Sequence, residues 1–135
     1  MSTTLKALFA GLGAWLVSFI MPVNRFLLFV TALVVADLIT GIVAARKRSE
    51  KIRSDRMRGT VTKVAMYFIA ILAARGMDVV FLIPKNLHLD LTWFIAAFIA
   101  VTEFKSVLEN VEESTGVDLW TAVGRKLGKI FGKDG

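Results

Sequence analysis

The sequence predicts an all-α integral membrane protein with three to four transmembrane helices and a C-terminal amphipathic helix. The first observation is composition: 56% of the 135 residues are hydrophobic, which is more than a soluble domain of this length needs for its core. The second is that the apolar residues fall into long blocks, some reaching the roughly 20 residues that a helix needs to cross a bilayer. A water-soluble globule is therefore not expected.

Four apolar blocks are candidate spans, at 7–21, 26–45, 64–83 and 87–104. The first has only about 15 apolar residues and no signal-cleavage pattern, so it is either a thin, tilted crossing or a helix in the interface. Pro22 with Asn24 and Arg25, and Pro84 with Asn86, predict tight turns between neighbouring blocks. We expect a transmembrane domain over 1–113 and a cytoplasmic, basic amphipathic tail over 114–135.

The basic residues gather between the second and third spans, and this sets the orientation. The connector from Arg46 to Lys63 holds eight basic residues against two acidic ones, a net charge of +6. The positive-inside rule places this connector and the C-terminus in the cytoplasm. Because the run lies between two spans, its nearest anions are lipid phosphates and not nucleic acid. The residues expected to act at the membrane surface or in topology are Arg46, Lys47, Arg48, Lys51, Arg53, Arg56, Arg58 and Lys63.

A last helix is predicted after Gly116, with Asp118 as its N-cap. Five apolar residues share one face of it, and three basic residues lie off that face. This pattern is typical of a helix resting on an anionic inner leaflet. The apolar residues are Trp120, Val123, Leu127, Ile130 and Phe131, and the basic ones are Arg125, Lys126 and Lys129.

Charged residues inside the second and third spans are the first candidates for function. Asp37 lies about 12 Å from the cytoplasmic end of its span, too deep to reach water easily. It shares a helix stripe with Gly41 and Ala45, and small residues on such a stripe allow close helix contact. Arg75 lies three residues before Asp78, and antiparallel packing would bring it near Asp37. We expect these residues at an oligomerisation or pore-lining surface, the alternative being an internal salt bridge that fixes helix packing.

A second polar group lies where the fourth helix leaves the membrane. Glu103, Ser106 and Asn110 share one side of the helix, with Glu109 at its flank. They predict either a subunit contact or simple solvation of the helix end. No nucleophile, base and orienting group converge there, so we do not expect an enzyme. The chain has no cysteine and one histidine, and we expect no metal or other cofactor.

Taken together, these motifs resemble the phage lysis and toxin-secretion holin family. The resemblance rests on Asp37-Leu38-Ile39-Thr40-Gly41 with Ala44-Ala45, a basic connector, Gly59 and Lys63, a span ending near Asp78, and Glu103-x-x-Ser106-Val107-Leu108-Glu109-Asn110 with Gly116 beyond. It covers about Phe26 to Gly116. The connector is richer in arginine than the serine-containing pattern of that family.

The resemblance implies a small protein of the bacterial cytoplasmic membrane that oligomerises with itself and opens lesions. Through these lesions an endolysin, or another protein without a signal peptide, would cross and bring about host lysis or protein release. Two other functions fit the residues. One is a small multi-span transporter or ion channel, and the other is an interaction protein, such as a holin antagonist or a membrane anchor.

Overall fold

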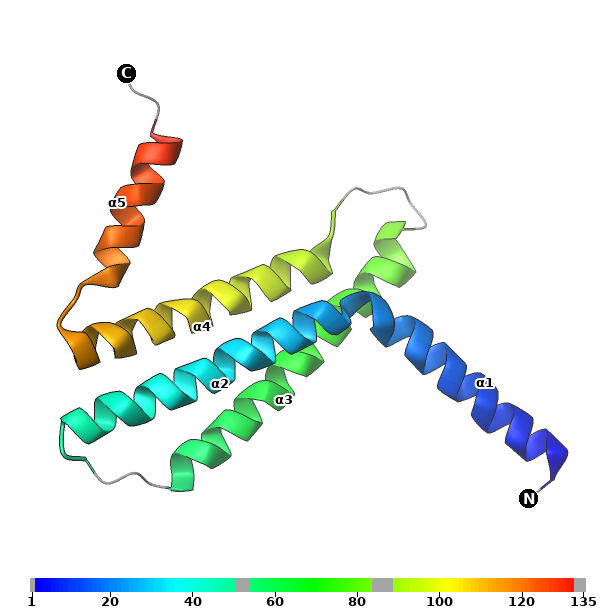
Figure 1. The fold of residues 1–135 in the computed structure, drawn as a ribbon. Helices are drawn as coiled ribbons and strands as arrows, with labels where there is room; N and C mark the ends of the chain where they lie inside the picture. Colours follow the sequence, from blue (N-terminus) through cyan, green and yellow to red (C-terminus); the bar gives the residue numbers. More distant parts are fainter. Residues whose placement is uncertain (1, 51–53, 84–88, 133–135) are drawn as a thin grey trace.

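The computed structural model describes residues 2–50, 54–83 and 89–132, and for 54–56 the backbone alone. The elements, shown in Figure 1, are α1 (Thr3–Ile20), the 3₁₀ turn η1 (Met21–Val23), α2 (Asn24–Lys47), α3 (Ser54–Met77), the π-helical turn η2 (Asp78–Leu82), α4 (Leu91–Thr115) and α5 (Leu119–Phe131). The described residues contain no strand. Three helical stretches are long and apolar enough to cross a membrane: Thr3–Lys47, Met57–Leu82 and Leu91–Thr115. The predicted fold class is confirmed.

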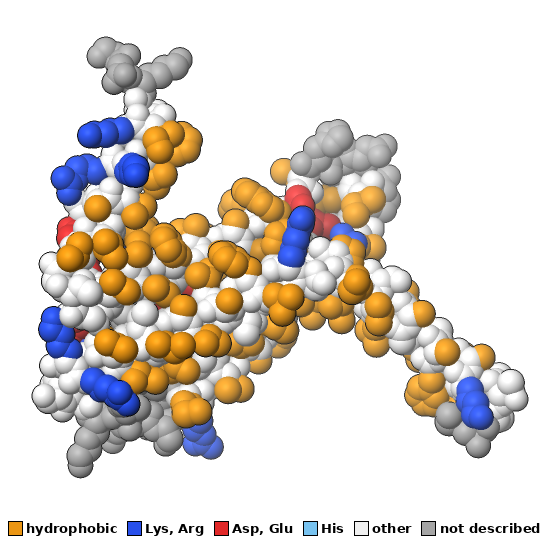
Figure 2. All heavy atoms as spheres, in the orientation of Figure 1, with side chains coloured by type: hydrophobic (Ala, Val, Ile, Leu, Met, Phe, Trp, Pro, Cys, Tyr) orange, Lys and Arg blue, Asp and Glu red, His pale blue; other side chains and the backbone are white. Residues whose placement is uncertain are grey.

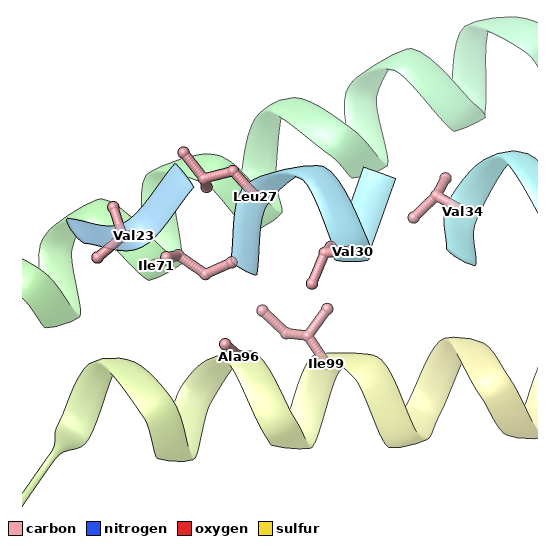
Figure 3. Close-up of a cluster of buried hydrophobic side chains, with 7 residues drawn as sticks. All are labelled: Val23, Leu27, Val30, Val34, Ile71, Ala96 and Ile99. Carbon is pink, nitrogen blue, oxygen red and sulfur yellow. The ribbon is translucent and has the colours of Figure 1, made fainter. Parts of the chain in front are cut away.

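Helices α2, α3 and α4 form a bundle (Figure 1). Helices α2 and α4 run side by side in the same direction, and α3 packs against both and runs in the opposite direction. Their apolar faces meet because Leu27, Val30 and Val34 repeat at helical spacing along one side of α2. Figure 3 shows the resulting core, which comprises Val23, Leu27, Val30, Val34, Ile71, Ala96 and Ile99.

The ends of the later helices are set by residues that the sequence places at their boundaries. Asp90 accepts a hydrogen bond from the backbone N–H of Trp93 at 2.8 Å and begins α4. Gly116 takes the left-handed conformation, with φ of 75°, and ends α4. Asp118 caps α5, as predicted; hydrogen bonds from the side chain and then the backbone of Thr121 lower the pKa of Asp118 below its usual range. This carboxylate is therefore ionised at neutral pH, as a helix N-cap prefers.

Helix α1 leaves the bundle (Figure 1), and none of its residues is buried. The predicted tight turn at Pro22 is a short 3₁₀ turn, after which α2 continues in a new direction. The turn is only three residues long, and η1 leads directly into α2 without loop residues. The bundle supplies three apolar helices, and α1 is a fourth that lies outside it.

The basic connector is shorter than predicted. Helix α3 begins at Ser54, so Arg58 and Lys63 lie on a helix and not in a loop. Hydropathy locates the apolar block and not the ends of the helix. Because arginine and lysine are good helix formers, α3 extends beyond the apolar block into the basic residues. Of the other predicted connector residues, Lys51 and Arg53 lie outside the described residues. Residues 84–88, in the predicted turn before the fourth span, do so as well.

Figure 2 shows how the side chains divide between surfaces. Hydrophobic side chains spread over the visible faces of α1, α2 and α4, whereas Lys and Arg gather on α5 and at the end of the bundle where α2 leads toward α3. This division is typical of helices whose sides face lipid and whose ends face water.

Replacing Ile71 by alanine tests the core. Ile71 is fully buried, at 0% exposure, so the change should leave a cavity and lower the free energy of unfolding by about 2 kcal/mol or more. Thermal unfolding of the purified protein in detergent, followed by circular dichroism, measures this loss. Ile69→Ala on the same helix, where the side chain is 62% exposed, should change little. Equal effects of the two substitutions would contradict the bundle described above.

Candidate functional site

A cluster of charged side chains joins the three bundle helices at one level. The ammonium of Lys63 on α3 lies 3.1 Å from Asp37 Oδ2 on α2 and 3.1 Å from Glu103 Oε2 on α4. One cation is therefore shared by two carboxylates. Lys63 reaches both because α3 runs antiparallel to α2 and α4 and lies against each of them.

Neutral polar groups complete this cluster. The Tyr67 hydroxyl donates to Glu103 Oε1 at 2.6 Å, one helical turn from Lys63. The Asn110 amide donates to Asp37 Oδ1 at 3.0 Å and to Thr40 Oγ1 at 3.2 Å. Asp37 thus accepts hydrogen bonds from α3 and α4, and Glu103 accepts them from two successive turns of α3. We refer to Asp37, Thr40, Lys63, Tyr67, Glu103 and Asn110 as the polar cluster.

The carboxylates of the polar cluster are largely buried and are stabilised there by their partners. Glu103 is 1% exposed, and the Asp37 side chain is 20% exposed. In lipid an unpaired carboxylate would carry a large desolvation penalty. Removing one partner therefore lowers the stability of the bundle by more than the intact pair contributes to it. The arrangement therefore fixes how α2, α3 and α4 pack against one another.

A pocket of about 370 Å³ opens beside the polar cluster. It is lined by Asp37, Leu38, Gly41, Gly59, Thr60, Lys63 and Asn110. It is large enough to admit several water molecules. The two glycines widen it because neither carries a side chain. The pocket can hydrate one side of the cluster, and it can hold a small polar solute.

A second polar contact closes the opposite end of the bundle. The Asp78 carboxylate accepts hydrogen bonds from the backbone N–H groups of Leu91 and Thr92, at 3.0 and 2.9 Å, and from the Thr92 hydroxyl. Asp78 therefore caps α4 from another helix, satisfying N–H groups that a helix start leaves free. Arg75 lies one turn earlier, and its Nε is buried without a hydrogen-bond partner among the described residues.

The C-terminal ends of α2 and α4 are joined by basic residues of the predicted connector. Lys47 Nζ donates to the Ser114 carbonyl at 2.8 Å, and Arg48 pairs with Glu50 and Glu113. Hydrogen bonds first to Glu50 and then to Glu113 raise the pKa of the Arg48 guanidinium. Because these groups are exposed, the pairs add little stability, but they align the ends of the two helices.

The structure brings together some of the residues that the sequence singled out. Asp37, Glu103 and Asn110 meet in the polar cluster, and Gly41 lines its pocket. The remaining predicted residues are distributed as follows: Ala45 is buried in the bundle, Ser106 is half-buried, Glu109 is exposed beside Lys105, and Arg46, Arg58, Arg125, Lys126 and Lys129 are exposed. The side chain of Arg56 lies outside the described residues.

The expected pairing of Asp37 with Arg75 is wrong. Asp37 pairs with Lys63, and Arg75 lies twelve residues farther along α3, about 18 Å away along the helix axis. The expectation failed because α3 begins earlier than its apolar block. Lys63 consequently lies well inside α3 and opposite Asp37. The predicted span began at residue 64 and therefore left Lys63 in the connector.

Sequence analysis assigned Lys63 to topology and missed Tyr67 and Thr40 as partners of the acids. Lys63 and Tyr67 are spaced four apart, and Thr40 is three residues from Asp37. These spacings place each pair on one helix face, which was the available signal. The spacing of Lys63 and Tyr67 indicates a shared helix face only if α3 is known to include Lys63.

The described residues offer no group of three or more His, Cys, Asp or Glu side chains placed to hold a metal ion. The polar cluster contains no hydroxyl or thiol nucleophile beside a free base, because both carboxylates are engaged by Lys63. Its chemistry is that of a buried ion-pair network.

The fold and the polar cluster define a small helical membrane protein whose spans are joined by embedded charges. Comparison with known families makes this specific: the model of the bacteriophage holin family matches residues 14–129. The chain belongs to the bacteriophage holin family, a family of non-enzymatic membrane proteins. No curated protein and no solved structure matches the chain.

Replacing Lys63 by methionine tests the polar cluster. It leaves Asp37 and Glu103 without their cation, and the free energy of unfolding should fall by about 3–5 kcal/mol. Thermal unfolding in detergent measures the change. Adding Glu103→Gln to Lys63→Met removes one uncompensated carboxylate and should restore part of the loss. Unchanged unfolding of the single variant would show that the cluster does not hold the helices together.

Proposed function

We propose that this protein is a holin of the bacterial cytoplasmic membrane. It accumulates as separate bundles and then oligomerises into lesions, through which an endolysin or another protein without a signal peptide crosses. Family membership supports the holin role in general. The observation that carries the proposal further is the ionic network buried among the bundle helices, with Glu103 1% exposed.

The size of the chain requires assembly if the passage is to admit a protein. Three or four helices of about 30 Å cannot enclose a protein-sized opening, so many copies must contribute to it. The polar cluster supplies a reason for two distinct states. While bundles are dispersed, Lys63 satisfies Asp37 and Glu103 within one chain; on assembly, neighbouring copies and water replace lipid around the bundle, and other packings become accessible.

The residues then take separate roles in this proposal. The polar cluster and the Asp78 cap, with Arg75 nearby, hold the dispersed bundle together. Gly41 and Ala45 allow close helix contact. Ser106 and Glu109 lie near the inner end of α4, where we propose contacts between copies. Arg46 and its basic neighbours keep the connector and the C-terminus on the cytoplasmic side.

Expression of the protein alone in a bacterium tests the holin proposal. Growth should stop abruptly after a delay, and a co-expressed cytoplasmic muralytic enzyme should appear outside the membrane, because large lesions form only above a threshold of assembly. Enzyme release and membrane potential are followed together. Continued growth with an intact potential would rule the proposal out.

A small transporter or ion channel is the second candidate, and the pocket beside the polar cluster favours it. The pocket of about 370 Å³ presents a carboxylate, an ammonium and an amide to a small solute. In that case ions or small solutes would leak while the muralytic enzyme stayed inside the cell. The same expression experiment therefore separates the two functions by the size of what escapes.

We further propose that α5 lies on an anionic inner leaflet. Arg125, Lys126 and Lys129 are exposed on this helix, and so are Ile130 and Phe131, at 67% and 78%. Exposed bulky apolar side chains beside basic ones match an interface with acyl chains below and lipid phosphates around.

Replacing Arg125, Lys126 and Lys129 together by glutamine tests this placement. At about 1 kcal/mol for each basic residue, the membrane attraction of α5 should fall by about 3 kcal/mol, or about a hundredfold. The measurement is protection of α5 from protease in vesicles containing phosphatidylglycerol, using the full chain. Vesicles of phosphatidylcholine alone are the control, in which the substitutions should matter little. Equal protection of both proteins in both vesicles would contradict the proposal.

A further inference from the structure

An apolar groove of about 300 Å³ runs along the bundle between α2 and α4. Val30 and Ala96 form its floor and are buried, at 1% and 3% exposure. Ala97 beside them carries only a methyl group, so the space above the floor is left open. Phe29 on α2 and Trp93 on α4 form the two walls, and both are more than half exposed. We refer to this feature as the α2–α4 groove.

The groove lies within a belt of uncharged residues that surrounds the bundle. The belt covers residues 26–36 of α2, 64–74 of α3 and 91–102 of α4. At one border it meets the polar cluster, and at the other it meets the end of the bundle at which α2 and α4 begin. Its height is about 17 Å along the helix axes. One leaflet of a hydrocarbon core of about 30 Å has nearly this thickness, so the belt matches one leaflet.

Arg25 lies at the mouth of the groove, directly before the belt. It is the second residue of α2 and is exposed. Its guanidinium carbon lies 5.0 Å from the centre of the Phe26 ring, and Phe26 lines the groove. Stacking on the ring orients the planar guanidinium and leaves its N–H groups for an acceptor.

Within the described part of the chain, the Arg25 side chain has no hydrogen bond and no ion pair. The acid nearest to the start of α4 is Asp90, and its carboxylate accepts the backbone N–H of Trp93 at 2.8 Å. A guanidinium at the edge of an apolar belt therefore faces the region where a bilayer places its phosphates.

A phospholipid combines the two chemical features that this site can bind. Its phosphate accepts two parallel N–H groups from one guanidinium, and its acyl chain is apolar along its whole length. The groove extends from Trp93 to Val101, which is about 12 Å along the helix and therefore within one leaflet. A helix of a second copy can also pack on alanines, but Asp90, its acid at this level, already caps α4.

We propose that the α2–α4 groove binds one phospholipid, with the phosphate on Arg25 and one acyl chain against Ala97 and Ala100. The lipid belongs to the leaflet at the end where α2 and α4 begin (Figure 1). The site depends on the bundle and its membrane border, so it stands or falls separately from the holin function. While the lipid is bound, it keeps other helices from packing on this face.

Native mass spectrometry of the full chain, released from detergent micelles, tests the proposal by counting retained lipids. Dioleoyl phosphatidylglycerol carries both parts of the ligand, dioleoylglycerol lacks the phosphate, and glycerophosphoglycerol lacks the acyl chains. One phosphatidylglycerol should be retained per chain. Each incomplete ligand should bind at least about tenfold more weakly, because it loses either the charged hydrogen bonds or the apolar burial. Equal retention of dioleoylglycerol and phosphatidylglycerol would overturn the proposal.

Two substitutions separate the parts of the site. Arg25→Gln should lower retention of phosphatidylglycerol about tenfold and leave that of dioleoylglycerol unchanged. Ala97→Leu fills the groove and should lower retention of both lipids. Ala73→Leu adds the same bulk at an exposed position of α3 and should change neither. Circular dichroism verifies that each variant is folded, and if Ala97→Leu is not, the response of Arg25→Gln to the two lipids still decides.

Three results would contradict a lipid site in the groove. The first is equal retention of phosphatidylglycerol by Arg25→Gln and the unsubstituted chain. The second is unchanged retention by folded Ala97→Leu. The third is a lipid-free dimer of the unsubstituted chain that Ala97→Leu dissociates, because a second copy would then occupy the groove.

Discussion

The shared ammonium of Lys63 is the interaction on which the bundle depends. Lipid offers no hydrogen bonds to a polar group, and Lys63 supplies one to each of Asp37 and Glu103 at 3.1 Å. Each of the three charges comes from a different helix. Their pairing therefore sets the distance between α2, α3 and α4 and also their relative axial position. Apolar contacts alone fix axial position weakly, since one aliphatic residue can replace another along a stripe.

The rest of the bundle is consistent with that register. At one end, Asp78 satisfies the first N–H groups of α4, and at the other, Lys47 reaches the carbonyl of Ser114. Between the polar cluster and the Asp78 end lies the apolar core around Ile71 (Figure 3). Helices α1 and α5 contribute no buried residue, so they can change position without breaking the core. A fixed unit with two separately placed helices suits the passage from dispersed bundles to an assembly that we propose.

Helix α4 carries polar residues of two kinds within the same few turns. Glu103 and Asn110 face the other helices and are paired there, whereas Lys105 and Glu109 face outward and pair only with each other among the described residues. The 3.6-residue period of the helix separates the two sets. The inner set stabilises the bundle, and the outer set lies on its surface.

The sequence by itself determined that this is a helical membrane protein, because the length and hydropathy of its apolar blocks depend only on local composition. It also located the cap at Asp118, and it singled out Asp37 as an embedded charge and Glu103 and Asn110 as polar residues on one side of the fourth helix. The tertiary structure decided which charge pairs with which. Lys63 and not Arg75 meets Asp37, because the start of α3 at Ser54 shifts the helix relative to α2, and hydropathy does not register a helix that continues into charged residues. The separation of α1 from the bundle was likewise beyond the sequence, since it depends on the direction that η1 gives the chain and not on the apolar character of either helix.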